Sequence, residues 1–83
     1  MSLEIENSVR EFRQQRGWTQ AELAQAMGVS RKTVNTVENG IFAPSIAVAL
    51  RFAHALGQPV EDLFRLAGPD DTAGGRPRYL PPP

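Results

Sequence analysis

Apolar residues recur at the three- and four-residue spacing of a helix in the first half of the chain, and a glycine follows each such stretch. Ser8 and Thr19 each stand three residues before a glutamate, which is the spacing of a capping box at the start of a helix. Ser30 suits the capping position of a third helix. The three predicted helices cover residues 8–16, 20–27 and 31–38.

The second half of the chain repeats this organisation. Pro44 and Ser45 open a predicted helix that Gly57 closes, and Pro59 stands at the start of a last short helix. From residue 68 the chain holds five prolines and three glycines, so this segment cannot be helical and is expected to form a tail. We therefore expect an all-α fold of five helices with no clear sheet. Its expected divisions are an N-terminal arm at 1–7, a folded domain at 8–66 and a tail at 67–83.

The apolar positions of the five helices predict a single core. In the fourth helix the chosen stripe is Ile46, Ala49, Leu50, Ala53 and Leu56, which follows helical spacing. The predicted core residues are Val9, Phe12, Trp18, Leu23, Ala24, Met27, Val29, Val34, Val37, Ile46, Leu50, Ala53, Leu56, Leu63 and Phe64.

Composition narrows the function classes. The chain has 83 residues, 41% of them apolar and 22% charged, which suits one small folded domain. It has no cysteine and a single histidine, His54, so disulfides, thiolate metal sites and catalytic triads are excluded. We expect no enzyme activity, no metal and no cofactor. No apolar run is long enough to span a membrane, and the N-terminus lacks the apolar segment of a signal peptide, so a cytoplasmic location is expected.

Charge gives no support to nucleic-acid binding by itself. Nine basic and nine acidic residues cancel, whereas proteins that bind nucleic acids usually carry a basic excess. Any such function must therefore rest on sequence pattern and on the local placement of charge.

The most informative segment runs from Gln20 to Asn39. Ala24 is the fifth of its twenty residues and Gly28 is the ninth, with apolar residues at five further positions. A small residue at position 24 lets two helices approach closely, and glycine supplies the positive φ that a short turn between them needs. This combination predicts a helix-turn-helix at residues 20–39.

On these residues the sequence resembles the Cro/C1-type repressors, the XRE family of helix-turn-helix regulators. The resemblance extends from Val9 to about Leu66 and is strongest to the short, stand-alone bacterial regulators. The segments that carry it are residues 13–20, Leu23-Ala24, Gly28-Val29-Ser30, residues 37–40 and Pro44-Ser45.

The resemblance implies a lambda-repressor-like domain whose third helix reads bases in the major groove. An arginine can pair with guanine and an asparagine with adenine, and both occur on the exposed side of that helix. The residues expected to read bases are Arg31, Lys32, Asn35 and Thr36. The residues expected to contact phosphates are Thr19, Gln20, Ser30, Thr33, Asn39 and Gly40.

Two further features follow from the same resemblance. The family pairs an arginine and a glutamate as a partly buried ion pair, which here would be Arg13 and Glu38. Many relatives also carry a lysine or arginine after the Asn-Gly pair, where this chain has Ile41 and Phe42. An exposed apolar loop suits protein contact better than DNA contact.

Two functions from different classes remain open. One is a sequence-specific regulator, most simply a repressor, that binds double-stranded DNA as a homodimer. The other is a protein-interaction module, such as an antitoxin or an adaptor, whose partner binds through Ile41, Phe42 or the tail.

The two ends of the chain suggest a further hypothesis. Residues 3–6 alternate apolar and acidic, and residues 76–80 alternate basic with apolar or aromatic, which is the period of a strand. The hypothesis is that these segments pair with each other across a dimer.

Overall fold

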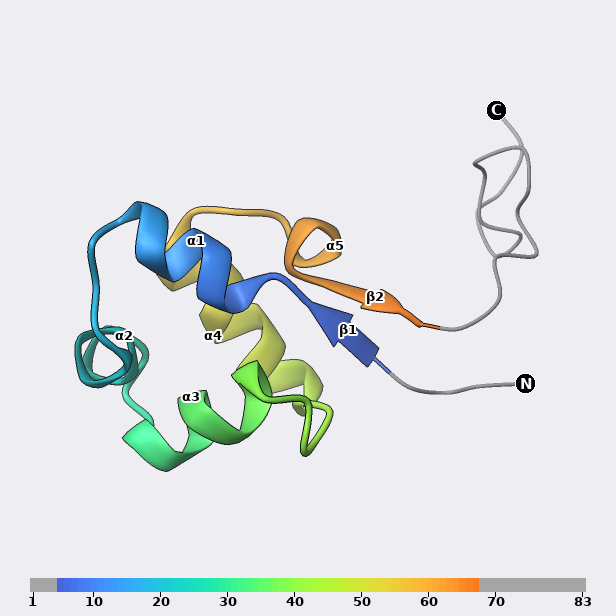
Figure 1. The fold of residues 1–83 in the computed structure, drawn as a ribbon, viewed down its shortest axis with the longest axis horizontal. Helices are drawn as coiled ribbons and strands as arrows, with labels where there is room; N and C mark the ends of the chain where they lie inside the picture. Colours follow the sequence, from blue (N-terminus) through green and yellow to red (C-terminus); the bar gives the residue numbers. More distant parts are fainter. Residues whose placement is uncertain (1–4, 68–83) are drawn as a thin grey trace.

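The computed structural model describes residues 5–67, and within that range it has five helices and a two-stranded sheet. The elements are β1 (Ile5–Asn7), α1 (Val9–Gln15), α2 (Gln20–Met27), α3 (Arg31–Glu38), α4 (Ile46–Leu56), α5 (Val60–Leu63) and β2 (Phe64–Leu66). The five predicted helices are confirmed, and the expectation of no sheet is wrong. In Figure 1, α1 and α4 lie between α2 on one side and the small sheet on the other.

Three helices begin at the predicted residues and are capped there by side chains. The Thr19 hydroxyl accepts from the Glu22 N–H at 3.0 Å, and the Glu22 carboxylate accepts from the Thr19 N–H at 2.8 Å, which completes a capping box. Ser30 and Ser45 likewise accept from backbone N–H groups in the first turns of α3 and α4. These local sequence signals therefore fix where α2, α3 and α4 begin.

The predicted capping box at Ser8 is wrong. The Ser8 hydroxyl caps no backbone group of α1 but accepts from Arg65 at 3.0 Å, and the Ser8 N–H donates to the Leu63 carbonyl at 2.9 Å. Asn7 takes over part of the capping, because its side-chain oxygen accepts from the Val9 N–H at 3.1 Å. The chain enters α1 directly from β1, so the contacts of the sheet decide how this helix starts.

The sheet is antiparallel and pairs the two ends of the described chain. Ile5 lies opposite Leu66, Glu6 opposite Arg65 and Asn7 opposite Phe64. A strand at the N-terminus was predicted from its alternation, and its described part, residues 5–7, forms β1. Glu6 of β1 does face an arginine, as the hypothesis expected of this strand. That arginine is Arg65 of β2, whose Nε lies 3.3 Å from the Glu6 carboxylate. The predicted partner at residues 76–80 lies outside the described residues.

Within the described residues the core contains nine buried apolar side chains, and all but one of them were predicted. They are Val9, Leu23, Ala24, Met27, Val34, Val37, Phe52, Leu56 and Leu63. Phe12, Trp18, Val29, Ala53 and Phe64 pack against them while remaining partly exposed.

Helix α4 buries a side that agrees only in part with the predicted stripe: Leu56 is buried and Ala53 packs against the core, as predicted. Ile46 is 80% exposed and Leu50 is 56% exposed, so both core assignments are wrong, whereas Phe52 is fully buried. The Phe52 ring meets Phe64 edge to face, with ring centroids 5.8 Å apart. Because α4 is apolar on most of its surface, its own spacing does not select one side, and the larger aromatic side chain fills the core instead.

Candidate nucleic-acid interface

The turn between α2 and α3 has the geometry that its sequence predicted. Ala24 is buried where the two helices meet, and its carbonyl accepts from the Val29 N–H at 3.0 Å. Gly28 has a φ of +74°, and a Cβ added there would lie 3.2 Å from a guanidinium nitrogen of Arg51. The turn is thus fixed by a left-handed residue and by close packing on its inner side.

The outer side of α3 presents polar groups. Arg31 and Lys32 are exposed at the start of the helix, and within residues 5–67 their side chains make no hydrogen bond or ion pair. The Ser30, Thr33 and Thr36 side chains instead bond within the helix: Ser30 caps it, and the Thr36 hydroxyl donates to the Lys32 carbonyl at 3.0 Å. Within residues 5–67, the side chains of these two cations have all their donors available for a ligand.

Three of the predicted site residues meet in one hydrogen-bonded group. The Gln20 side-chain oxygen accepts from Asn35 at 3.3 Å, and the Asn35 side-chain oxygen accepts from Asn39 at 3.2 Å. Gln20 donates its own amide to Glu38 at 3.1 Å. These contacts join the start of α2 to the middle and end of α3, and they fix which end of each amide points outward.

Glu38 is the buried centre of this group. Its side chain has no exposed surface, and Arg13 binds both of its carboxylate oxygens, at 2.6 Å and 3.1 Å. Arg13 is itself only 11% exposed and also donates to the Trp18 carbonyl at 2.7 Å. The predicted ion pair is confirmed, and it ties α1 to the end of α3.

The electrostatics of this pair favour the charged form of both groups. Burial raises the pKa of the Glu38 carboxyl, but hydrogen bonds from Arg13, Gln20 and Arg10, with the charge of Arg13, outweigh it and lower that pKa below its ordinary value. The hydrogen bond to Glu38 raises the pKa of Arg13 despite the opposing effect of burial. Among the described residues no buried side-chain polar atom lacks a hydrogen-bond partner.

Two other residues predicted to contact phosphate already make hydrogen bonds within the protein. The Thr19 side chain is exposed but already accepts from the Glu22 N–H in the capping box. The Gly40 N–H donates to the Val37 carbonyl at 3.0 Å, so a phosphate would have to displace that bond.

One member of the polar group was missed from the sequence. Arg10 of α1 donates to the Asn39 side-chain oxygen at 2.9 Å and lies 3.4 Å from a Glu38 oxygen. The signal for it was the three-residue spacing between Arg10 and Arg13, which places both on one side of α1.

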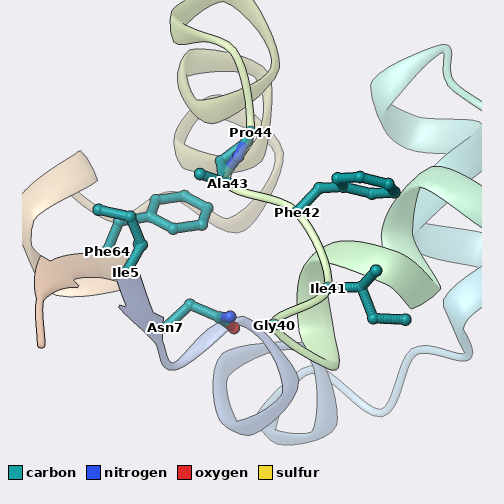
Figure 2. Close-up of a pocket in the computed structure, with 8 residues that line it drawn as sticks. All are labelled: Ile5, Asn7, Gly40, Ile41, Phe42, Ala43, Pro44 and Phe64. Carbon is teal, nitrogen blue, oxygen red and sulfur yellow. The ribbon is translucent and has the colours of Figure 1, made fainter. Parts of the chain in front are cut away.

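The loop after α3 is apolar and exposed, as the sequence suggested. Ile41 is 60% exposed and Phe42 is 68% exposed. Figure 2 shows both across a shallow pocket from Ile5 and Phe64 of the sheet. Ile46 and Leu50 of α4 are exposed as well, and we call the exposed apolar side chains of this segment the 41–50 surface. None of the helices in residues 5–67 has the length and apolar character to cross a membrane.

Comparison with known proteins agrees with this geometry. Residues 9–63 match the helix-turn-helix family HTH_3. The chain is 46% identical over 59 residues to an uncharacterized HTH-type transcriptional regulator of Methanothermobacter thermautotrophicus, covering 70% of this chain and 86% of that protein. It is 37% identical over 62 residues to the uncharacterized HTH-type transcriptional regulator YgzD of Bacillus subtilis, covering 75% of this chain and 94% of that protein. The solved structure of the restriction-modification controller protein C.AhdI from Aeromonas hydrophila superimposes with a TM-score of 0.62 at 33% identity, over 65% of this chain and 82% of that one.

Proposed function

Because the chain belongs to the helix-turn-helix family of Cro/C1-type (XRE) transcriptional regulators, we propose that it binds double-stranded DNA sequence-specifically, as a homodimer, with α3 in the major groove. The observation that carries this proposal is the outer side of α3. Two cations with no partner among residues 5–67 stand at its start, and Asn35 is held beside them by neighbouring amides. Such a side suits base edges, which differ in their donors and acceptors.

The base contacts follow from the chemistry of these groups. Arg31 presents a guanidinium fork that matches guanine O6 and N7. Asn35 has one amide hydrogen and one lone pair already engaged, and the remaining hydrogen and lone pair match adenine N7 and N6. Lys32 and Thr36 complete the proposed base-reading set.

The phosphate contacts flank α3 on both sides. Gln20 stands at the start of α2, where the helix dipole favours an anion, and it keeps one amide hydrogen beyond the one given to Glu38. Thr19, Ser30 and Thr33 stand near the starts of α2 and α3. Asn39 and Gly40 follow the end of α3. Together these groups set the position of the domain on the duplex without reading sequence.

The proposed dimer uses the 41–50 surface. A second copy of this chain suits it because two recognition helices then read two half-sites, which raises the affinity of a chain with no net charge. Occupation of a promoter by such a dimer gives repression in the simplest case.

Selection of bound sequences from a random DNA pool tests the function. A palindromic consensus is expected, and Arg31→Ala should weaken binding to it by about 1–3 kcal/mol while relaxing base choice at one position of each half-site. Gln20→Ala serves as the comparison: it should weaken binding to all sequences, and it should leave the base that Arg31 reads unchanged, because the Gln20 side chain contacts Asn35 and not Arg31. An Arg31→Ala protein with unchanged affinity and base preference would contradict the assignment of α3.

Sedimentation equilibrium tests the dimer. Phe42→Asp should raise the dimer dissociation constant while the melting temperature stays close to that of the wild type, since Phe42 is exposed. A wild-type chain that stays monomeric in solution and on DNA would contradict the dimer and favour a different protein partner at this surface.

A further inference from the structure

Helix α1 brings a cation to the surface where α3 ends. The Arg10 guanidinium donates to the Asn39 side-chain oxygen at 2.9 Å, and its Nε lies 3.4 Å from Glu38. Its side chain is 47% exposed, whereas that of Glu38 has no exposed surface. Arg10 thus stands at the edge of the polar group, on its solvent side.

The positive charge of Arg10 is not balanced within this group. Glu38 carries one negative charge, and Arg13 satisfies both of its oxygens at 2.6 Å and 3.1 Å. Arg10 contacts one oxygen only, at the longer distance of 3.4 Å. Two guanidinium cations against one carboxylate leave a positive charge, and the exposed member of the pair is Arg10.

The loop that follows α3 supplies no cation of its own. Ile41 and Phe42 occupy its start, and the N–H groups of Asn39, Gly40 and Ile41 all donate to carbonyls of α3 at 3.0–3.1 Å. A phosphate that approaches Asn39 therefore finds few free backbone donors there. Arg10 is the charged donor in contact with Asn39.

We propose that Arg10 binds a DNA backbone phosphate beside Asn39, at the end of the recognition helix. This inference rests on the proposed function. A guanidinium has five N–H groups, and the contacts with Asn39 and Glu38 use two of them, so three remain for phosphate oxygens. The contact with Asn39 also holds the Arg10 side chain in place before DNA arrives.

The salt dependence of DNA binding tests the proposal. In Arg10→Gln, the slope of log affinity against log salt concentration should become shallower by about 0.9 for each bound subunit, which is about 1.8 for the proposed homodimer. Between about 50 mM and about 200 mM salt, the affinity of the wild-type dimer should therefore fall about 12 times more than that of the variant dimer. The base preference should not change, because a phosphate contact carries no sequence information.

Two matched variants separate this role from a structural one. Arg10→Lys keeps the charge and should keep the slope of the wild type. Arg65→Gln removes the same charge from β2, where Arg65 is 50% exposed and pairs with Glu6, and it should leave the slope unchanged. Circular dichroism melting of each variant shows that binding is compared between folded proteins.

The outcomes distinguish this inference from the proposed function. If Arg10→Gln binds DNA with the wild-type salt slope, the phosphate contact of Arg10 is overturned and the proposed function stands. The same holds if Arg10→Lys and Arg65→Gln each lose as much slope as Arg10→Gln. Failure of the wild type to select any sequence would overturn the proposed function, and the inference with it.

Discussion

Helices α3 and α4 expose opposite kinds of surface. The outer side of α3 carries Arg31 and Lys32, whereas the first half of α4 exposes Ile46 and Leu50. They are also held to the domain by different means. The end of α3 is fixed by the buried carboxylate of Glu38, and α4 is fixed by aromatic and aliphatic packing.

This difference suits the two tasks that we propose for these helices. A polar helix surface next to a hydrogen-bonded amide group suits DNA, where groups must meet donors and acceptors in defined places. An apolar helix surface suits another protein, because burying it removes apolar area from water. The domain is therefore expected to lose stability through an unpaired buried charge when the contacts of α3 are removed, and through a cavity when those of α4 are removed.

The largest effect is expected from Glu38→Ala. This change leaves Arg13 nearly buried without its anion, which typically costs about 3–5 kcal/mol. The free energy of unfolding, measured in urea, should fall by that amount. Glu6→Ala, which removes an exposed partner of Arg65, should cost less than about 1 kcal/mol. Equal losses in the two variants would show that burial of the Arg13–Glu38 pair does not matter.

A comparable loss is expected on α4 from Phe52→Ala. Removal of a fully buried phenyl ring leaves a cavity against Phe64 and should cost about 3–5 kcal/mol. Leu50→Ala removes an exposed side chain from the same helix and should change the unfolding free energy by no more than about 0.5 kcal/mol. The reverse order in urea unfolding would mean that α4 buries the side first expected from its sequence.

A smaller effect is expected where α2 packs on α3. Ala24→Leu adds bulk at a buried contact and should destabilise the domain by about 1–3 kcal/mol. The same substitution at Ala21, which is exposed on α2, is the control and should have little effect. An unaltered melting curve for Ala24→Leu would argue against close approach of the two helices.

The smallest expected effect is a dependence on pH. The pKa of Glu38 is lower in the folded protein than in the unfolded chain, because hydrogen bonds from Arg13, Gln20 and Arg10 outweigh the effect of burial. Its contribution to stability is therefore present above the unfolded value of about 4.3 and is lost as pH falls through the folded value. The difference in unfolding free energy between the wild type and Glu38→Gln should shrink below about pH 4. A difference that stays constant from neutral pH to pH 3 would contradict this role for the carboxylate.

Much of the candidate site follows from local sequence, and the part that does not has a physical reason. The caps at Thr19 and Ser30 act through groups three residues away, so local spacing is enough to predict them. Arg10 and Asn39 are twenty-nine residues apart, and only the packing of α1 against the end of α3 brings them together. The local spacing of Arg10 and Arg13 places both on one side of α1, but it does not identify Asn39 as a partner.

By itself, the sequence determined the helices, the caps at Thr19, Ser30 and Ser45, and the turn at Gly28, because these depend on neighbours within one turn of the chain. It also determined the buried edge of α3, since that helix has only one apolar side. The tertiary structure decided which side of α4 is buried, because several sides are apolar and the space beside Phe64 selects Phe52. It also decided the partner of β1, because a strand can satisfy its backbone groups only with a strand that the fold brings alongside it.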